Sequence, residues 1–524
     1  MGGFADTLKK NRTQIVVLAV LLLLFVSASQ SMELSDWAIT VLRGLSVGAL
    51  TFLVAAGFSL ILGLMDVLNL AHGELFMLGA YVGWTVYVRP DTFVDVLAPI
   101  AFLGVGLALM PMLTALLRPL SHTLSPNLTR TWPWVGLLAA FGLLAATLPK
   151  YPITIWNPEE YAISPATFSL AMSQGNLVLP EPAAVTTSPL LLLVGILLGG
   201  LLLATAVVGF ALRESTAVST ARLPKSPLII AGVLLVIGLA AYFGNNSLTN
   251  SLASMNTTNL FFVAMLVATL TGALLGAGVE VVLIRPLYDR PIYQIMLTLG
   301  LSFIGIETVR AIWGRPEFTM PKPALFAASG VGCEKEVVNF WERIAHQCST
   351  VFLFDGRVRT YNEIFVILVG LVVLIAVWML LQRTRIGMII RAGVQDSDMV
   401  EALGINVRRV FTFVFALGVG LAALGGVLAG PSIGLSNGMG TQVLLLALIA
   451  LAIGGLTSFP GAAAGAVLVG LLQQFIIKFG QIGINLPFLA EPFKPSPPLV
   501  PASTVLLMVI ILLILPQGLF GRKE

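Results

Sequence analysis

The chain has 524 residues, of which 57% are hydrophobic and only 10% are charged. This composition excludes an ordinary soluble protein, which needs many more charged side chains on its surface, and it indicates a protein solvated mostly by lipid. The net charge of +4 is small, and no stripe of basic residues suggests a nucleic-acid partner. Two cysteines and three histidines do not make a ligand set for a structural metal, so we expect neither metal nor cofactor.

Apolar segments of spanning or nearly spanning length follow one another along the chain. The hydropathy pattern therefore predicts an all-α, polytopic bundle of about fourteen transmembrane helices. The expected spans are 15–27, 38–62, 70–88, 94–117, 132–148, 190–212, 228–243, 260–284, 295–313, 364–381, 410–429, 443–456, 462–477 and 505–515. The first segment could also be a cleaved signal peptide, but the residues after it make a poor cleavage site, so a retained helix is preferred.

The basic residues predict the orientation of these spans. When the segments cross the bilayer alternately, most Lys and Arg residues next to them fall on one side, which the positive-inside rule makes the cytoplasm. Both termini then lie in the cytoplasm. The long loops 149–189 and 314–362 fall on the opposite side. Cys333 and Cys348 share the second of these loops, where a disulfide and two free thiols are about equally expected.

Four polar side chains lie between the second and third apolar segments. They are Asp66, Asn69, His72 and Glu74. Ionisable groups at membrane depth are costly, so these residues are expected to face a substrate pathway or a gate. A short cytoplasmic turn with capped helix ends is the alternative. A metal site is disfavoured because no further histidine is placed to join His72.

Two later segments carry helix-ending signals. A helix is expected to end before Pro286, with Arg285 and Arg290 at the inner interface of the membrane. The other segment is a sharp reversal whose glycine spacing permits close helix packing, although it could also be a re-entrant hairpin. The residues of this turn are Gly454, Gly455, Ser458, Pro460 and Gly461.

The segment 382–409 is polar and basic, and it connects two long apolar segments. Asp398 and Glu401 have the spacing of a capping box and Gly404 is a suitable stop, so a helix of about two turns is expected. A helix this short needs a surface to pack on, so we expect it to dock on another subunit; a plain connecting loop is the alternative. Its apolar stripe would be Met399, Val400 and Leu403. The residues expected to couple to the partner are Arg385, Gly387, Arg391, Asp398, Met399, Val400, Glu401, Leu403 and Gly404.

In this order the segments resemble one known family. Residues 69–73, Asn-Leu-Ala-His-Gly, are similar to the Asn-Phe-Ala-His-Gly signature of permease subunits of branched-chain amino-acid ABC importers, the LivH type. The helix end at Arg285, the segment 383–430 and the turn at 454–461 match the later landmarks of that family in sequence order. The resemblance covers 41 to about 89 and then 260 to the C-terminus.

The resemblance implies a subunit of an importer in a bacterial inner membrane. Its implied partners are two cytoplasmic ATPase subunits, a second homologous permease of the LivM type, a periplasmic solute-binding protein and the lipid bilayer. The family also includes permeases for urea and short amides. The solute therefore stays open between a branched-chain amino acid and another small polar molecule, and so does the choice between a homodimeric and a heterodimeric permease.

The resemblance also divides the chain into four parts. Residues 1–37 carry an extra N-terminal span, and 38–90 form the first part of the permease core. Residues 91–259 are an insertion of about four spans, whose role stays open. Residues 260–524 complete the core and contain the coupling loop at about 382–409.

Two classes of function remain after these observations. No Gly-Lys-Ser/Thr triplet occurs, so the chain has no P-loop and is expected to be a transport subunit without ATPase activity, not an enzyme. The alternative is a self-sufficient secondary transporter, although no convincing internal repeat supports it. An intramembrane enzyme is disfavoured because the spans offer only isolated polar residues, such as Glu280, Glu307 and Arg310.

Overall fold

The structure is a computed structural model. It describes residues 32–152, 187–214 and 225–521, apart from 124, 289, 315–316, 330–332, 334–339, 354–355, 396 and 485–490, together with positions 17, 19, 23 and 26. Within these residues nearly all regular structure is helical, so the predicted all-α class is confirmed. The chain divides into two compact units. The first consists of Met1–Trp84, Glu160–Ser173 and Asn256–Glu524, and the second of Thr85–Glu159 and Gln174–Met255.

The second unit is a small helical bundle. Its helices are α5 (Pro90–Ala108), α6 (Met110–Thr123), α7 (Pro126–Thr147), η1 (Leu148–Lys150), α10 (Pro189–Glu214), α11 (Lys225–Phe243) and α12 (Asn245–Ala253). Helix α10 packs on α5 and α7, while α11 packs on α5. Phe102, Leu193 and Ile196 are central to its core. The boundaries of this unit lie close to the insertion expected at 91–259.

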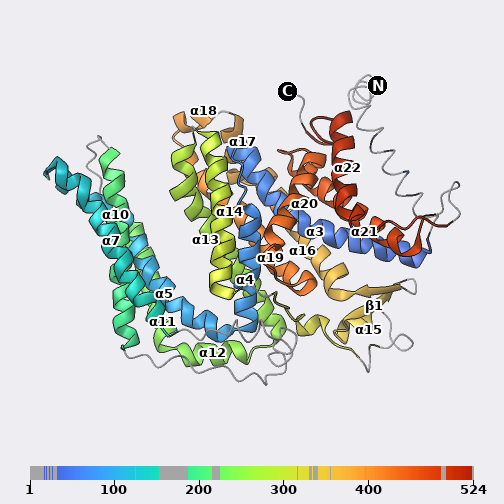
Figure 1. The fold of residues 1–524 in the computed structure, drawn as a ribbon, viewed down its shortest axis with the longest axis horizontal. Helices are drawn as coiled ribbons and strands as arrows, with labels where there is room; N and C mark the ends of the chain where they lie inside the picture. Colours follow the sequence, from blue (N-terminus) through green and yellow to red (C-terminus); the bar gives the residue numbers. More distant parts are fainter. Residues whose placement is uncertain are drawn as a thin grey trace. The chain divides into compact units, whose positions relative to one another are not determined.

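The first unit is built around α3 (Leu34–Met65), which is buried from Thr51 to Ile61. The other long helices are α4 (His72–Val88), α13 (Thr257–Val279), α14 (Pro291–Trp313), α16 (Val366–Arg383), α19 (Val407–Ile433), α20 (Met439–Gly454), α21 (Phe459–Ile482) and α22 (Leu499–Ile514), as seen in Figure 1. Helix α3 packs against α16, α19, α20 and α21, and α13 packs along α19. The contact of α3 with α21 is close because Gly48 faces the backbone of Ala466 and Val467.

Residues 314–365 form the small irregular part of the first unit. It contains η4 (Ala324–Phe326), α15 (Phe340–Ala345), β1 (Thr350–Leu353), β2 (Gly356–Arg359) and η5 (Thr360–Phe365). The two strands are antiparallel, and the facing residues Val351 and Val358 are both buried. A disulfide joins Cys333 to Cys348, which settles in this structure the choice that the sequence had left open. The all-α prediction did not include this hairpin.

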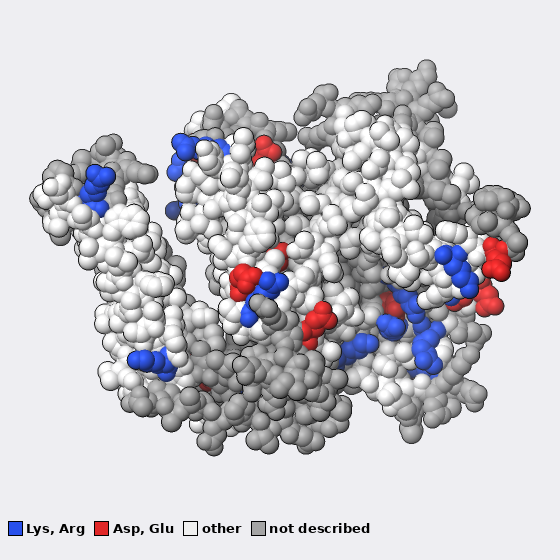
Figure 2. All heavy atoms as spheres, in the orientation of Figure 1, with Lys and Arg blue, Asp and Glu red and all other residues white. Residues whose placement is uncertain are grey.

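Ten helices in the described part of the chain are long and apolar enough to cross a membrane. Two shorter apolar helices, α20 and α22, and the 17-residue α4 coincide with three more of the predicted spans. The remaining predicted span, 15–27, lies outside the described residues apart from positions 17, 19, 23 and 26. The total of about fourteen therefore stays a prediction. On the face that Figure 2 shows, charged side chains are few among the described residues and most of their surface is uncharged, as lipid-facing helices require.

The end of the helix expected before Pro286 differs from the prediction in its position and in its hydrogen-bond pattern. The regular α-helix ends earlier, at Val279, and continues as a π-helical turn, η2 (Glu280–Ile284), and a 3₁₀ turn, η3 (Arg285–Leu287). Proline has no N–H for the usual bond to the carbonyl four residues back, so the helix changes its hydrogen-bond pattern around this position.

Candidate functional site

The polar cluster expected at Asp66, Asn69, His72 and Glu74 is divided in two. Asp66 is exposed and takes a left-handed conformation (φ 53°) at the C-terminus of α3, where its N–H donates to the carbonyl of Leu62 at 3.0 Å. It therefore ends a helix and does not join the other three residues. Asn69, His72 and Glu74 are all buried.

Asn69 and His72 fix the junction between α3 and α4. The Asn69 Oδ1 accepts a hydrogen bond from the N–H of Ala71 at 3.2 Å, which holds the turn in front of α4. The Nε2 of His72 lies 3.2 Å from the carbonyl oxygen of Val54 on α3. Because a carbonyl only accepts, Nε2 must carry the proton in this contact. The imidazole also meets the Phe58 ring edge to face, with centroids 5.7 Å apart. These contacts describe a helix junction.

Glu74 lies in the first turn of α4 and is only 4% exposed. Its Oε1 accepts hydrogen bonds from Ser302 Oγ on α14 at 3.1 Å and from Thr441 Oγ1 on α20 at 3.0 Å. Its Oε2 has no hydrogen-bond partner among the described residues. A Cβ at Gly440 would come within 2.6 Å of Oε2, so the glycine leaves room for the carboxylate. Glu74 is thus a carboxylate held by three helices and satisfied on one oxygen only.

The segment 382–409 consists of two short helices and not one. Helix α17 (Arg385–Gln395) follows α16 directly, and α18 (Ser397–Ala402) precedes α19. Gly387 faces the carbonyls of Leu380 and Leu381, so no larger residue fits at this bend. Arg391 donates from Nη1 to the Leu381 carbonyl and to Oε1 of Gln382 at 3.1 Å, which ties α17 to the end of α16. Arg385 is exposed.

Helix α18 differs from the expected helix in two respects. It begins at Ser397, so Asp398 lies inside it and is not the N-cap that a capping box with Glu401 requires. The expected apolar stripe is also wrong at one position: Met399 and Leu403 are 62% and 74% exposed, but Val400 is only 4% exposed. Val400 faces inward because α18 packs on α17 and α19. Gly404 ends the helix with a positive φ of 82°, as expected of a C-terminal glycine.

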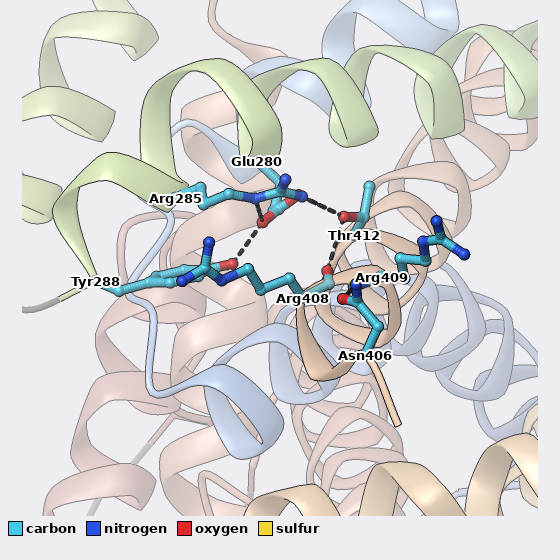
Figure 3. Close-up of polar contacts among 7 residues, drawn as sticks. All are labelled: Glu280, Arg285, Tyr288, Asn406, Arg408, Arg409 and Thr412. Atoms are coloured by element: carbon cyan, nitrogen blue, oxygen red, sulfur yellow. Dashed lines mark hydrogen bonds and ion pairs between the residues drawn. The ribbon is translucent and has the colours of Figure 1, made fainter. Parts of the chain in front are cut away.

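A polar network that the sequence did not predict joins the end of α13 to the start of α19 (Figure 3). Glu280 is fully buried and forms a two-point ion pair with Arg285, with Nε–Oε1 and Nη2–Oε2 distances of 3.1 and 2.8 Å. The Thr412 hydroxyl on α19 donates to Oε2 at 2.7 Å. The Tyr288 hydroxyl donates to Oε1 at 2.5 Å. We call Glu280, Arg285, Tyr288 and Thr412 the α13–α19 network.

Tyr288 stays protonated in this network. Burial, and then the hydrogen bond to Glu280, raises the pKa of Tyr288 far above its usual range. Its hydroxyl therefore acts as a fixed donor. Just before Thr412 along the chain, the Asn406 side chain accepts from the N–H of Arg409 at 3.1 Å and caps α19 (Figure 3). The α13–α19 network thus lies within two turns of the helix start that follows α18.

The turn between α20 and α21 brings together the residues that the sequence singled out. The Ser458 hydroxyl accepts from the N–H of Gly461 at 3.2 Å and caps α21, and Pro460 lies in its first turn. Gly454 and Gly461 face each other's backbone so closely that neither can carry a side chain. Gly455 has a φ of 113°, which glycine tolerates. The reversal is a tight packed turn.

The sequence singled out residues of each polar site but not the distant partners that complete it. Glu280 and Arg285 are five residues apart, but Thr412 is 132 residues from Glu280. Ser302 and Thr441 are 228 and 367 residues from Glu74. No pattern in a single sequence connects such positions. Among the described residues there is no group of three or more His, Cys, Asp or Glu side chains that could hold a metal ion.

The fold is that of a multi-pass membrane protein, and the polar side chains described above join its helices to one another. The chain belongs to the family described as the permease component of branched-chain amino acid transport systems, whose model matches residues 40–186 and 192–515. This confirms the family resemblance. The family is one of multi-pass, bacterial-type permeases without a catalytic domain.

Individual relatives are distant. The chain is 30% identical over 171 residues to the high-affinity branched-chain amino acid transport system permease protein BraD of Pseudomonas aeruginosa, covering 32% of this chain and 51% of the relative. It is 28% identical over 172 residues to the corresponding protein LivH of Escherichia coli, covering 33% and 51%. A fructose import permease protein, FruF of Bifidobacterium longum, is 28% identical over 120 residues, covering 21% and 34%. The chain thus spans about half the length of its nearer curated relatives. No solved structure matches the chain.

Proposed function

We propose that this chain is the membrane-spanning permease subunit of an ABC importer for branched-chain amino acids or a related small polar solute. Separate subunits hydrolyse the ATP. The observation that carries the proposal is an exposed apolar pair, Met399 on α18 and Leu403 directly after it, in a chain that belongs to this permease family. A short helix that exposes large apolar side chains on itself and at its end is suited to dock in a groove of a partner.

The proposed coupling surface consists of Arg385, Met399, Glu401 and Leu403, all exposed in this structure. Three further residues hold this surface in place through contacts with α16 and the rest of the segment. They are Gly387, Arg391 and Val400. Gly404 ends α18 and turns the chain toward α19. The proposed occupant of this surface is a cytoplasmic ATPase. Burial of the two apolar side chains would contribute about 1.5–3 kcal/mol for each that is fully buried.

The proposed transport mechanism is alternating access. Closure of the ATPase dimer moves α18. The short connection between α18 and α19 transmits this movement to α19, whose first turn Asn406 caps. The α13–α19 network then transmits the movement to α13 through the hydrogen bond between Thr412 and Glu280. The residues Asn69 and His72 hold the α3–α4 junction around which the solute pathway changes its access, and Asp66 terminates α3 beside it.

The wider assembly follows from the same proposal. The partners are two cytoplasmic ATPases, a second homologous permease of the LivM type and a periplasmic binding protein. The proposed topology has about fourteen spans, with both termini and α18 on the cytoplasmic side and the disulfide-bonded loop outside. The unit within 85–255 is proposed as an accessory insertion in the bilayer.

The substitution Leu403→Asp tests the docking surface. It should reduce co-purification of the ATPases, or uncouple ATP hydrolysis from uptake, while the subunit still inserts and folds. A matched control is Leu403→Met, which keeps a large apolar side chain at the same exposed position and should have little effect. Wild-type uptake with the ATPases still bound to the Leu403→Asp variant would refute the docking proposal. Uptake by the chain alone in liposomes would instead favour the secondary transporter.

A further inference from the structure

Three glutamates are buried in the described part of the chain, and they differ in how their charge is compensated. They are Glu74, Glu280 and Glu363. Glu280 pairs with Arg285, and Glu363 lies 3.4 Å from the guanidinium Nε of Arg43. Glu74 has no ion pair with a basic side chain in the part that the structure describes. Removing a carboxylate from water without a counter-charge is costly, so such an arrangement calls for an explanation.

One carboxylate oxygen of Glu74 accepts two hydrogen bonds, and the other accepts none from the described residues. Ser302 and Thr441 both donate to Oε1, so they orient the carboxylate but supply no charge. Oε2 has no partner and faces Gly440, while Gly305 on α14 lies against the Glu74 Cβ, where a Cβ of its own would come within 3.2 Å. Glycines on two helices thus lie against the Glu74 side chain, Gly440 at the carboxylate and Gly305 at the Cβ. This is the geometry of an acceptor with a free position.

We propose that Glu74, oriented by Ser302 and Thr441, receives the primary ammonium group of the solute during translocation. This inference rests on the proposed function and specifies the solute class. An ammonium brings the missing positive charge and N–H donors, which suit the two lone pairs of the free Oε2, since Oε1 already accepts from both hydroxyls. Neutral urea, amides or sugars can donate hydrogen bonds to this site but do not compensate its charge. The site therefore selects an amino acid over these solutes.

The Glu74 site lies where three helices meet, so a separation of these helices would expose it to the solute. Glu74 comes from α4, Ser302 from α14 and Thr441 from α20, so the ammonium reaches Oε2 when α4 and α20 separate. In this structure Gly440 closes over that oxygen. A binding site that opens between packed helices and closes around its ligand is what alternating access requires.

The test uses the complete importer, with both permeases, the ATPases and the binding protein, reconstituted in liposomes. Uptake of radiolabelled leucine and of radiolabelled urea is measured together with ATP hydrolysis. Glu74→Gln keeps the size of the side chain and can still accept from the two hydroxyls, but it removes the charge. We expect it to lower leucine uptake at least about tenfold, because hydrogen bonds to charged groups are the strong ones. Glu74→Asp keeps the charge and should retain more uptake than Glu74→Gln.

The matched control is Glu307→Gln, the same change at a glutamate on α14 whose side chain is 67% exposed, which should leave uptake unchanged. If Glu74→Gln transports leucine as well as the wild type, or better than Glu74→Asp, a protonated structural carboxyl explains the site and the inference is wrong. If the wild type carries urea and not leucine, the inference also fails while the importer proposal stands. If neither solute is taken up and neither stimulates ATP hydrolysis, both fail.

Discussion

Replacing Arg285 with alanine removes the basic partner of a glutamate that is fully buried. Breaking a buried ion pair from one side costs about 3–5 kcal/mol, because the remaining charge stays in a poor solvent. The Arg285 side chain is 30% exposed, so we expect the lower end of this range, about 3 kcal/mol. If Glu280 is changed to glutamine as well, the unpaired charge disappears. The double variant should then be more stable than Arg285→Ala alone, by about 1–2 kcal/mol.

The measurement is thermal unfolding of the detergent-solubilised subunit, with the Glu280→Gln, Arg285→Ala and double variants in one series. A control pair is available in Glu307 and Arg310 on α14, which form an exposed ion pair at 2.6 Å. Breaking that pair should change stability by less than about 1 kcal/mol. The reasoning is refuted if the double variant is less stable than Arg285→Ala, because the cost would then not come from an uncompensated Glu280.

Three further predictions concern other parts of the molecule. In a variant without native cysteines, a cysteine at Met388 should react with an impermeant reagent only from the cytoplasmic side, and one at Arg357 only from outside; the reverse pattern would overturn the proposed topology. Replacing both native cysteines by serine should destabilise the loop around the β-hairpin by about 3 kcal/mol, seen as faster proteolysis there, since the disulfide closes a separation of 15 residues. Gly454→Val should cost more than 1 kcal/mol, roughly, in thermal stability, because its side chain would meet the backbone of α21, whereas Gly438→Ala, with open space around it, should cost much less.

Hydropathy and short-range signals predicted the helices well. The expected spans from 38 onward coincide with helices because a spanning segment must be apolar over most of its length, and that property is local. Gly404 was predicted as a helix stop for a local reason as well, since a positive φ favours glycine. The same reasoning failed for Val400, because the side of α18 that turns inward depends on α17 and α19 and not on its own six residues.

The candidate sites could be predicted only in part. The position of Glu74 between two apolar segments singles it out in the sequence, since carboxylates are costly at membrane depth. It does not reveal that Asp66 turns outward into a helix end, or that Ser302 and Thr441 reach the Glu74 carboxylate. Those facts depend on how α4, α14 and α20 pack, and helix packing in a membrane is set by small residues and shape more than by any polar pattern.

A movement of α18 would displace α19 first, and the α13–α19 network lies at the start of that helix. Only four residues connect α18 to α19, and they include the glycine that ends one helix and the asparagine that caps the next. A displacement of α18 is therefore transmitted to the first turns of α19 with little slack. Thr412 lies there, hydrogen-bonded to Glu280 in the π-helical turn, whose altered hydrogen-bond pattern marks a place where a helix can bend. Because α3 packs along α19 as well and leads into the Asn69–His72 junction, we expect the same movement to reach α4, the helix that carries Glu74.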